Sequence, residues 1–431
     1  MSPSPSSPRL SRSYLQTVCA HSGCDVNASH SRDVVAPIHL ATTYERSAPN
    51  PLQHPPTSID PTIAPRGTDG GVCGYPGGYC YSRLANPTRN ALERVLTDLD
   101  DGLASQAYAS GMAAASAILS ALAPGDHVIF GVDLYAGVKG VRGMLCDARN
   151  VKWDAANAAS KEDIVRKIQP STKLVWVESV GNPMCSVADV RGIRDAIQTL
   201  GMASPPLIVV DATWASQFVS RPLLHGADIV LHSLTKYIAG HSDCLGGALI
   251  RTRTSTPALD KMWTMACNAC TIAGSALDPF TCYMVMRGIR SLWCRIKVQC
   301  ANAMEVATWL SKHPRVSCVR YPGLSNDPGH VTLLQNGVSD SQDDDPDALF
   351  GGMLSFEVEG GAEAALRCLE ACKLCVRATS LGGTETLLEH RRSVEAFAGH
   401  SDTPEGLVRM SVGLESVQDI INDLDQALNS I

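Results

Sequence analysis

The sequence has no long apolar run, no extended basic segment and no internal repeat, and these absences narrow what the protein can be. No apolar stretch reaches the ~18 residues of a membrane-spanning helix, so we expect no membrane span. The chain carries 36 Lys and Arg against 43 Asp and Glu, a formal net charge of −7. This mildly acidic balance argues against nucleic acid as a partner, because a phosphate backbone attracts basic surfaces.

The cysteines do not follow the spacing of a disulfide framework, although the chain contains 16 of them. Cys267/Cys270 and Cys372/Cys375 have the spacing of metal ligands, but the two pairs lie far apart, in segments typical of ordinary helix or strand. We therefore expect no zinc and no other metal site. Scattered thiols are typical of a reducing compartment, which predicts a cytoplasmic protein.

The length of 431 residues and the apolar content of 45% predict a large core divided between two domains. Residues 1–80 are expected to form an N-terminal tail and arm, with a Pro/Gly-rich insertion from about residue 47. Residues 1–14 have the Ser, Pro and Arg content of a transit peptide, but their shortness and their prolines favour a disordered tail.

The remaining chain divides by pattern into two parts. Over residues 81–276, apolar runs near 127, 174, 207, 228 and 247 alternate with helical patterns, which predicts an α/β domain with a parallel sheet. Residues 277–431 predict a smaller α+β domain. There, an amphipathic helix over 280–312 is interrupted near Gly288, strands start at Met353 and Leu407, and helices cover 362–372 and 416–428.

Residues 227–247 carry the strongest chemical signal. A short apolar run predicts a buried strand, and Lys236 follows it in a cluster of small and hydroxylated residues. Burial disfavours the charged form of a lysine, and a neutral amine can form a Schiff base with an aldehyde. The hydroxyls of Ser233 and Thr235 can bind an anionic group beside it. A surface lysine in a polar loop is the plain alternative.

A second strand ends in Asp211, at the edge where open α/β sheets bind ligands. Pyridoxal phosphate enzymes require such a pair, a lysine for the imine and an acid opposite the pyridine nitrogen. The acid keeps the ring protonated, so that the ring withdraws electrons from the substrate. Lys236 and Asp211 together therefore favour a pyridoxal phosphate site over a surface loop.

With these motifs in this order, the sequence resembles the Cys/Met-metabolism PLP-dependent enzymes. The strand ending in Asp211, Ala227-Asp-Ile-Val, His232-Ser-Leu-Thr-Lys-Tyr and Gly240-His-Ser-Asp carry the resemblance, which runs from about Leu15 to the C-terminus. The family includes cystathionine γ-synthases and γ-lyases, cystathionine β-lyases, methionine γ-lyases and O-acetylhomoserine sulfhydrylases. It implies the PLP-dependent transferase fold of the aspartate-aminotransferase type, with pyridoxal 5′-phosphate in the large domain.

The resemblance also implies cofactor contacts outside the Lys236 segment. Ser110, Gly111 and Met112 match the family's phosphate-binding turn at a helix start, although a simple packing turn is the alternative. Tyr135 matches the tyrosine that stacks on the pyridine ring and exchanges a proton with the substrate, although a core tyrosine is the alternative. Asn182 matches the asparagine that bonds the ring oxygen and a substrate carboxylate oxygen.

Tyr81 and Arg83 precede Asn86-Pro87, which predicts a well-capped helix start. In the resembling family this tyrosine and arginine reach the cofactor phosphate of a neighbouring subunit, and an arginine fork suits a phosphate. The resemblance therefore implies a homodimer or homotetramer with shared active sites.

Arg409 lies in the middle of an expected strand, where an unpaired charge is costly, so we expect a fixed carboxylate partner. By resemblance it binds the substrate α-carboxylate, and Thr379 and Ser380 belong to the substrate-side loop. Lys236, Tyr135 and Asp211 are the expected catalytic residues, with Lys236 as base and Tyr135 as acid for the leaving group.

The chain departs from the family where the second half of cystathionine binds. Thr379 stands at the position of a glutamate that faces the distal amino group, and Gly140 at that of an arginine that faces the distal carboxylate. Arg391 and Arg392 also follow Glu-His where the family has proline. These departures favour γ-replacement on an O-acyl-homoserine, forming a C–S or C–C bond with an unusual nucleophile.

Two other functions stay open. A cystathionine γ-synthase, a cystathionine γ-lyase or another C–S lyase is compatible with the motifs if Lys139 or Arg142 replaces the missing contacts. The third possibility is a non-catalytic scaffold that has kept the fold.

Overall fold

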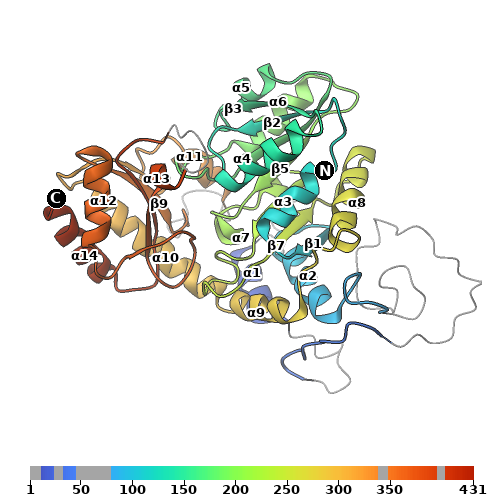
Figure 1. The fold of residues 1–431 in the computed structure, drawn as a ribbon, viewed down its shortest axis with the longest axis horizontal. Helices are drawn as coiled ribbons and strands as arrows, with labels where there is room; N and C mark the ends of the chain where they lie inside the picture. The colour runs from blue at the N-terminus through green and yellow to red at the C-terminus, as the bar shows by residue number, and fades with distance from the viewer. Residues whose placement is uncertain (1–10, 24–32, 45–78, 338–347, 396–402) are drawn as a thin grey trace, which may run out of the picture.

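The computed structural model describes residues 11–23, 33–44, 79–337, 348–395 and 403–431, which form two β-sheets with helices packed on them (Figure 1). Most of the Pro/Gly-rich insertion and the first ten residues lie outside the described residues. Within these ranges, no helix is both long enough and apolar enough to cross a membrane. The division at residues 80 and 276 stays a prediction.

The larger sheet has seven strands in the order β1-β7-β6-β5-β4-β2-β3. Its strands are β1 (Ala104–Tyr108), β2 (His127–Gly131), β3 (Lys152–Ala156), β4 (Thr172–Glu178), β5 (Leu207–Asp211), β6 (Ile229–Ser233) and β7 (Gly247–Arg251). Strands β2 to β6 run parallel, which the sequence predicts for β2, β4, β5 and β6, whereas β3 was not predicted. The parallel direction expected for the strand near 247 is wrong, because β7 is antiparallel to both β6 and β1.

The reversal of β7 follows from its connection. Residues 234–246, all of them described, contain no helix, so the chain returns beside β6 without the crossover that a parallel neighbour requires. Lys236 lies in this connection. The loop that carries Lys236 therefore takes the place of a crossover helix between β6 and β7.

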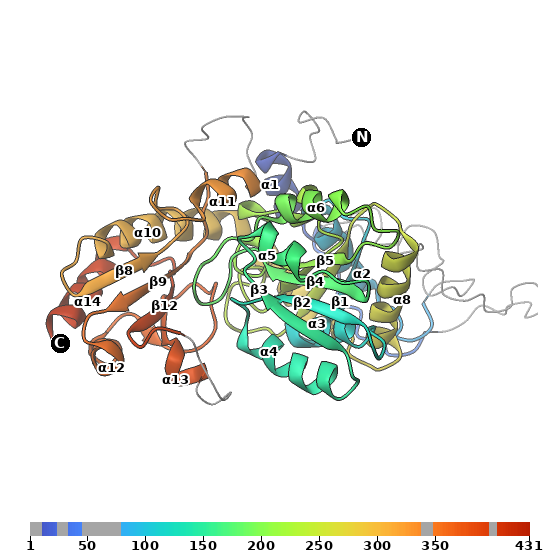
Figure 2. The ribbon, with the colours of Figure 1, turned by 90° about the horizontal axis from the view of Figure 1, so that it is seen from above.

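Helices cover both faces of this sheet, which is why most of its strands are almost fully buried (Figure 2). One face packs against α2 (Pro87–Leu99), α5 (Lys161–Arg166) and α6 (Val190–Thr199). The other packs against α3 (Gly111–Leu119), α4 (Ala136–Arg142) and α8 (Pro257–Thr271). Short elements are the π-helix Gly143–Asp147, α7 (Ser216–Val219) and the 3-10 helix Pro222–His225.

The smaller sheet has five strands in the order β10-β11-β12-β9-β8 and belongs to the C-terminal half. They are β8 (Val316–Arg320), β9 (Met353–Val358), β10 (Val376–Arg377), β11 (Leu387–His390) and β12 (Leu407–Ser411). The helices are α9 (Pro279–Ile289), α10 (Leu292–Leu310), α11 (His330–Asn336), α12 (Gly361–Ala371), α13 (Arg391–Glu395) and α14 (Val417–Asn429). The break between α9 and α10 and both predicted strands are confirmed, and so is the α/β fold.

The N-terminal tail ends earlier than the sequence predicts. Helix α1 (Arg12–Ala20) begins two residues before Tyr14, with the hydroxyl of Ser11 accepting a hydrogen bond from the Tyr14 N–H at 3.1 Å. Leu15 and Cys19 are buried in the main core. Disorder up to Tyr14 is therefore wrong for the last three residues of that segment, because one apolar face ties the helix down.

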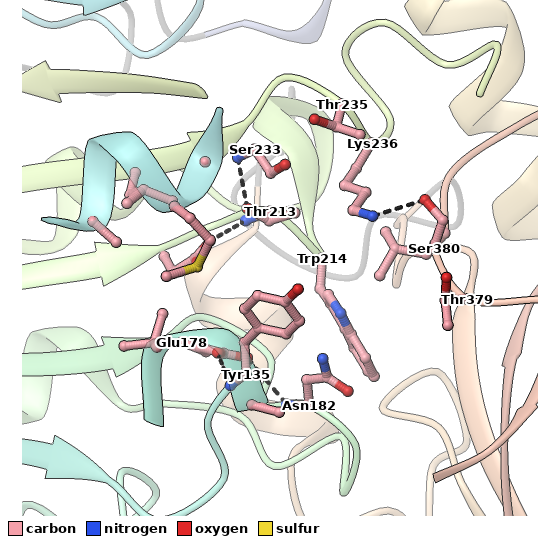
Figure 3. Close-up of a pocket in the computed structure, with 18 of the residues that line it drawn as sticks. Tyr135, Glu178, Asn182, Thr213, Trp214, Ser233, Thr235, Lys236, Thr379 and Ser380 are labelled. Atoms are coloured by element: carbon pink, nitrogen blue, oxygen red, sulfur yellow. Dashed lines mark hydrogen bonds between the residues drawn. The ribbon is translucent and has the colours of Figure 1, made fainter. Parts of the chain in front are cut away.

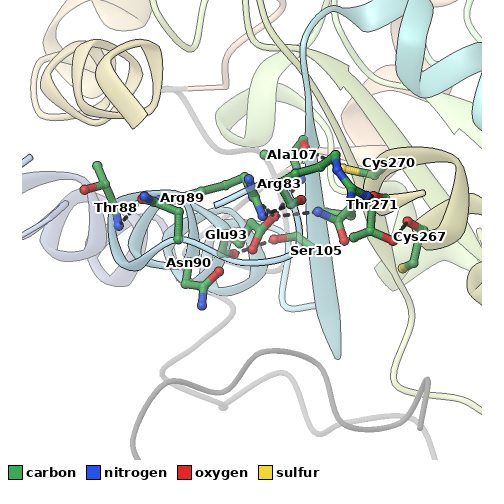
Figure 4. Close-up of polar contacts among 12 residues, drawn as sticks. Arg83, Thr88, Arg89, Asn90, Glu93, Ser105, Ala107, Cys267, Cys270 and Thr271 are labelled. Atoms are coloured by element: carbon green, nitrogen blue, oxygen red, sulfur yellow. Dashed lines mark hydrogen bonds and ion pairs between the residues drawn. The ribbon is translucent and has the colours of Figure 1, made fainter. Parts of the chain in front are cut away.

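Helix α2 carries a fully buried carboxylate that joins it to β1 (Figure 4). Asn86 caps the helix as predicted, accepting from the N–H of Thr88 at 2.9 Å. Glu93 accepts from Gln106 Nε2 at 2.8 Å and from the Ala107 N–H at 3.0 Å, and it pairs with Arg89. Burial raises the pKa of Glu93 to about 7, although the charge of Arg89 opposes that shift.

Stability should therefore depend on pH through Glu93. Its pKa is higher in the folded than in the unfolded chain, so its contribution is complete below pH 4.5 and is lost as pH rises to about 7. Between these limits the wild type should lose roughly 3 kcal/mol of unfolding free energy relative to Glu93→Gln. Urea titrations at several pH values measure the difference, with Glu305→Gln, exposed on α10, as control. Parallel pH profiles of wild type and Glu93→Gln would contradict the assignment.

Candidate active site

A cavity of about 500 Å³ lies where the carboxyl ends of β4, β5 and β6 meet the C-terminal sheet (Figure 3). Such a volume is typical of sites that enclose a small ligand. The cavity brings together all of the predicted site residues except Tyr81 and Arg83. The predicted residues that line the cavity are Ser110, Gly111, Met112, Tyr135, Asn182, Asp211, Ser233, Thr235, Lys236, Thr379, Ser380 and Arg409.

Lys236 enters the cavity from the loop that follows β6. Its Nζ donates a hydrogen bond to Ser380 Oγ at 2.7 Å, across to the C-terminal half of the chain. Burial and, to a lesser extent, the nearby charge of Arg409 lower the pKa of Lys236 to about 8, against the opposing effect of Glu389. About a tenth of the amine is then neutral at pH 7, far more than for an ordinary lysine.

Two carboxyl groups stand side by side at the strand ends. Glu178 ends β4 and Asp211 ends β5, and the two residues are register partners. Burial raises the pKa of both, and the charge of Asp211 raises that of Glu178 further. Glu178 accepts from the backbone N–H groups of Tyr135 and Asn182, whereas Asp211 accepts from that of Thr213 at 3.0 Å. Both carboxyl groups line the cavity, and Glu178 also positions two other lining residues, Tyr135 and Asn182.

The turn predicted to bind the phosphate lies at the start of α3. Ser110 caps the helix by accepting from the Ala113 N–H at 3.0 Å. A Cβ atom at Gly111 would lie 3.0 Å from Ser233 Cβ and 3.1 Å from Ser233 Oγ, so the turn sits directly against the end of β6. A Cβ atom at Gly247 would lie only 2.2 Å from Ser110 O. Glycine at both positions lets the first residues of α3 lie close to the Ser233 hydroxyl.

The loop that carries Lys236 is closed by Thr235. Its hydroxyl donates to Gly246 O at 3.2 Å and accepts from Gly246 N at 3.1 Å. The two ends of the loop are thereby held together beneath the lysine. Thr235 lines the cavity, and this pairing fixes the position of its side chain.

The opposite wall comes from the C-terminal half. Ser380 has a left-handed backbone, with φ of 91°, a conformation that costs of order 1–3 kcal/mol for a non-glycine residue. Arg409 donates to Ser380 O at 3.1 Å and to Asn182 Oδ1 at 3.4 Å, and pairs with Glu389 at 2.7 Å. The structure thus supplies the fixed carboxylate partner expected for Arg409.

Twelve further lining residues were not predicted from sequence, and four of them carry polar or aromatic side chains: Glu178, Thr213, Trp214 and Arg391. Glu178 and Thr213 lie at strand ends, the same signal that identifies Asp211, and could have been found by it. Trp214 and Arg391 also line the cavity, and Figure 3 shows the Trp214 indole beside Tyr135 and Asn182. Trp214 has no sequence signal beyond its closeness to Asp211.

Lys139 and Arg142 do not replace the missing contacts in this conformation. Among the described residues, the cavity lining includes neither of them. The Arg142 guanidinium instead lies 3.7 Å from the centroid of the Trp153 ring. At Gly140, a Cβ atom would meet nothing within 4 Å, so packing alone does not demand glycine there.

Tyr81 and Arg83 lie outside the cavity of their own chain. Arg83 donates to the carbonyl oxygen of Thr271, the last residue of α8 (Figure 4). Its guanidinium lies 5.6 Å from the centroid of the Tyr81 ring. Tyr81 is 40% exposed. Their expected reach into a neighbouring subunit stays a prediction.

The donor set fits pyridoxal 5′-phosphate. A capped helix start beside the Ser233 hydroxyl suits the phosphate, and a buried carboxyl group suits a protonated pyridine nitrogen. A lysine amine with a lowered pKa completes the set.

Comparisons with known proteins agree with this fit. A family model described as Cys/Met metabolism PLP-dependent enzyme matches residues 16–429. The cystathionine gamma-synthase of Mycobacterium tuberculosis is 39% identical over 362 residues, 83% of this chain and 88% of that protein. The cystathionine gamma-lyase of Bacillus subtilis is 36% identical over 364 residues, 82% and 89%. The crystal structure of metB from Corynebacterium glutamicum has a TM-score of 0.82 at 33% identity and covers 96% of this chain and 98% of its own.

The purified protein should be yellow, and borohydride should fix a pyridoxyl group on Lys236. Lys236→Ala should be colourless after gel filtration and should lose at least 10²–10⁴-fold in kcat, because the attachment point and the base are the same atom. Peptide mass mapping locates the modified lysine. Lys139→Ala, on α4 outside the cavity lining, is the matched control and should keep the colour. Unchanged colour in Lys236→Ala would falsify the assignment.

Proposed function

The chain belongs to the Cys/Met-metabolism PLP-dependent enzymes, and we propose that it catalyses γ-replacement on an O-acyl-homoserine with a nucleophile other than cysteine. One observation carries the proposal. The cavity contains the full set of groups for an amino acid around Lys236, whereas the position expected to face a second ammonium group is the neutral Thr379. The product would contain a new C–S or C–C bond at the γ-carbon.

Pyridoxal 5′-phosphate supplies, when bound, a covalent link to the substrate amine and a ring that withdraws electrons from Cα. Asp211 would hold a hydrogen bond at the ring nitrogen, because it lines the cavity at the end of β5, between β4 and β6. Ser110, Gly111, Met112, Ser233 and Thr235 would hold the phosphate.

Arg409 and Asn182 would bind the substrate α-carboxylate together, since Arg409 already donates to the side-chain oxygen of Asn182. Lys236 Nζ would take the proton from Cα and move it to and from Cβ. Its pKa of about 8 leaves part of the amine able to accept a proton at neutral pH, and the Ser380 hydroxyl holds that amine in place. Cα and Cβ deprotonation together activate the γ-carbon, so that its C–O bond breaks and the acyloxy group leaves as a carboxylate.

Tyr135 would orient the ring and protonate the leaving group. Its backbone is fixed by Glu178, and its ring projects into the cavity beside Trp214 (Figure 3). The tyrosine side chain is 43% exposed, so its hydroxyl can exchange protons with solvent between turnovers.

Elimination is the second candidate function, as in a cystathionine γ-lyase or another C–S lyase. The same proton transfers serve both outcomes, and relatives named synthase and lyase share similar identity with this chain. A scaffold without catalysis is disfavoured, because the cavity retains twelve of the predicted residues.

The proposal extends to assembly and compartment. A homodimer or homotetramer would let Tyr81 and Arg83, which lie outside their own cavity, reach that of a neighbour. A cytoplasmic location is supported by the 14 cysteines of the described residues, all of which are free thiols.

Shared sites should reveal themselves by complementation. Arg83→Ala and Lys236→Ala should each be nearly inactive alone, while mixed and reassembled chains should regain up to about a quarter of wild-type activity, the fraction of undamaged sites expected for random dimers. Lys236→Ala mixed with Asp211→Ala is the matched control, because both residues lie in one chain's cavity. Hybrids that form, shown by native mass spectrometry, but stay inactive would contradict shared sites.

The reaction type can be tested by offering O-acetylhomoserine with cysteine, sulfide, small thiols and carbon acids, and cystathionine alone in parallel. We expect a nucleophile other than cysteine to give the highest kcat/KM, because Thr379 offers no charge to an ammonium group. Making or cleaving cystathionine at rates far above any other pair would end the proposal. In deuterated water, exchange confined to Cα would exclude γ-chemistry, since γ-replacement also requires loss of a Cβ proton.

A further inference from the structure

Two arginines share one carboxylate in the cavity wall. Arg409 on β12 and Arg391 at the first position of α13 both pair with Oε2 of Glu389, Arg409 at 2.7 Å. Glu389 lies on β11 as the register partner of Arg409. All three residues are buried, and both arginines line the cavity. The two guanidinium groups therefore lie next to each other on the substrate side.

The neighbouring arginine shows that this placement is specific. Arg392 donates to Thr403 O at 3.2 Å and pairs with Glu405 at 3.5 Å, and its side chain is 43% exposed. Among the residues described, the cavity lining includes Arg391 but not Arg392. The turn from β11 into α13 thus sends one of two consecutive arginines into the cavity and the other to the surface.

A second guanidinium changes what the cavity can recognise. One arginine, Arg409, is enough for the α-carboxylate of an amino acid, and Arg391 offers another planar fork on the same wall. The same wall carries Thr379, which has no charge to offer an ammonium group. The wall is therefore matched to a partner that carries an acidic group without an amine.

We propose that Arg391 is a specificity-determining residue that binds a carboxylate of the second substrate, so that the nucleophile is an acid lacking an ammonium group. The proposal rests on the proposed γ-replacement and names its substrate class. In the alternative, Arg391 only neutralises Glu389 and holds Arg409, and a second carboxylate gains nothing from it.

A binding test separates these alternatives without turnover. Holoenzyme is titrated with 2-aminoadipate and with norleucine, which share the amino-acid half and chain length and differ in the terminal carboxylate, and the cofactor absorbance is followed. The wild type should bind 2-aminoadipate roughly tenfold to a hundredfold more tightly, the range for a charge-assisted hydrogen bond. Arg391→Gln should bring the ratio close to one, Arg391→Lys should keep part of it, and Arg392→Gln should leave it intact.

The kinetic test compares 3-mercaptopropionate with 3-mercapto-1-propanol as the thiol that replaces acetate on the γ-carbon of O-acetylhomoserine. The acid should have the higher kcat/KM, through a lower KM, and Arg391→Gln should remove that advantage. Equal binding of 2-aminoadipate and norleucine by the wild type would overturn the proposal even if Arg391→Gln fails to fold. A ratio that survives in folded Arg391→Gln would overturn it as well.

These experiments test the γ-replacement and the carboxylate subsite at Arg391 separately. If no acceptor yields a replacement product but 2-aminoadipate is preferred through Arg391, the proposed function fails and the carboxylate subsite stands. If replacement proceeds while the two amino acids bind equally, the proposed function stands and the subsite is rejected.

Discussion

The hydrogen bond from Lys236 Nζ to Ser380 Oγ connects the parts of the chain that carry the two sheets, through the amine proposed to react. The lysine comes from the loop beside the larger sheet, and the serine from a strained turn in the C-terminal half. Burial lowers the lysine pKa, and the charge of Arg409 on β12, in the C-terminal half, also lowers it. The reactivity of one amine thus depends on the docking of two halves of the chain.

The strained backbone of Ser380 lets this residue contact two side chains of the cavity at once. Its carbonyl oxygen accepts from Arg409 while its hydroxyl accepts from Lys236, so a single residue orients both of these side chains. Gly382, with φ of 75°, packs so closely that a Cβ atom would lie 2.6 Å from the backbone nitrogen of Tyr237. The turn is therefore held by contacts that leave little freedom, and these contacts maintain the strain.

The sequence predicted the site better than the sheet around it. Lys236, Asp211 and Asn182 follow buried strands, and strand ends of a parallel sheet converge on one edge, so local pattern was sufficient to bring them together. The direction of β7 could not be predicted in this way, because it depends on a connection that lacks a helix.

Other features were missed because their signal is not local. Strand β10 is only two residues long, and β8 is half-exposed with a broken register, so neither has a clear alternating pattern. Arg391 was visible as a departure from the family, but its entry into the cavity depends on where α13 starts. Glu178, by contrast, could have been predicted, because it ends a buried strand just as Asp211 does.

The position of the turn at Ser110 and Gly111 depends on a residue outside the cavity, Gly247. It belongs to β7, is not among the described residues that line the cavity, and has no side chain, yet it is the residue against which Ser110 rests. Any side chain there would displace the start of α3 from Ser233. When natural variants of this chain are compared, a change at Gly247 should therefore be grouped with changes of the cofactor site, although a survey of lining residues would score it as neutral.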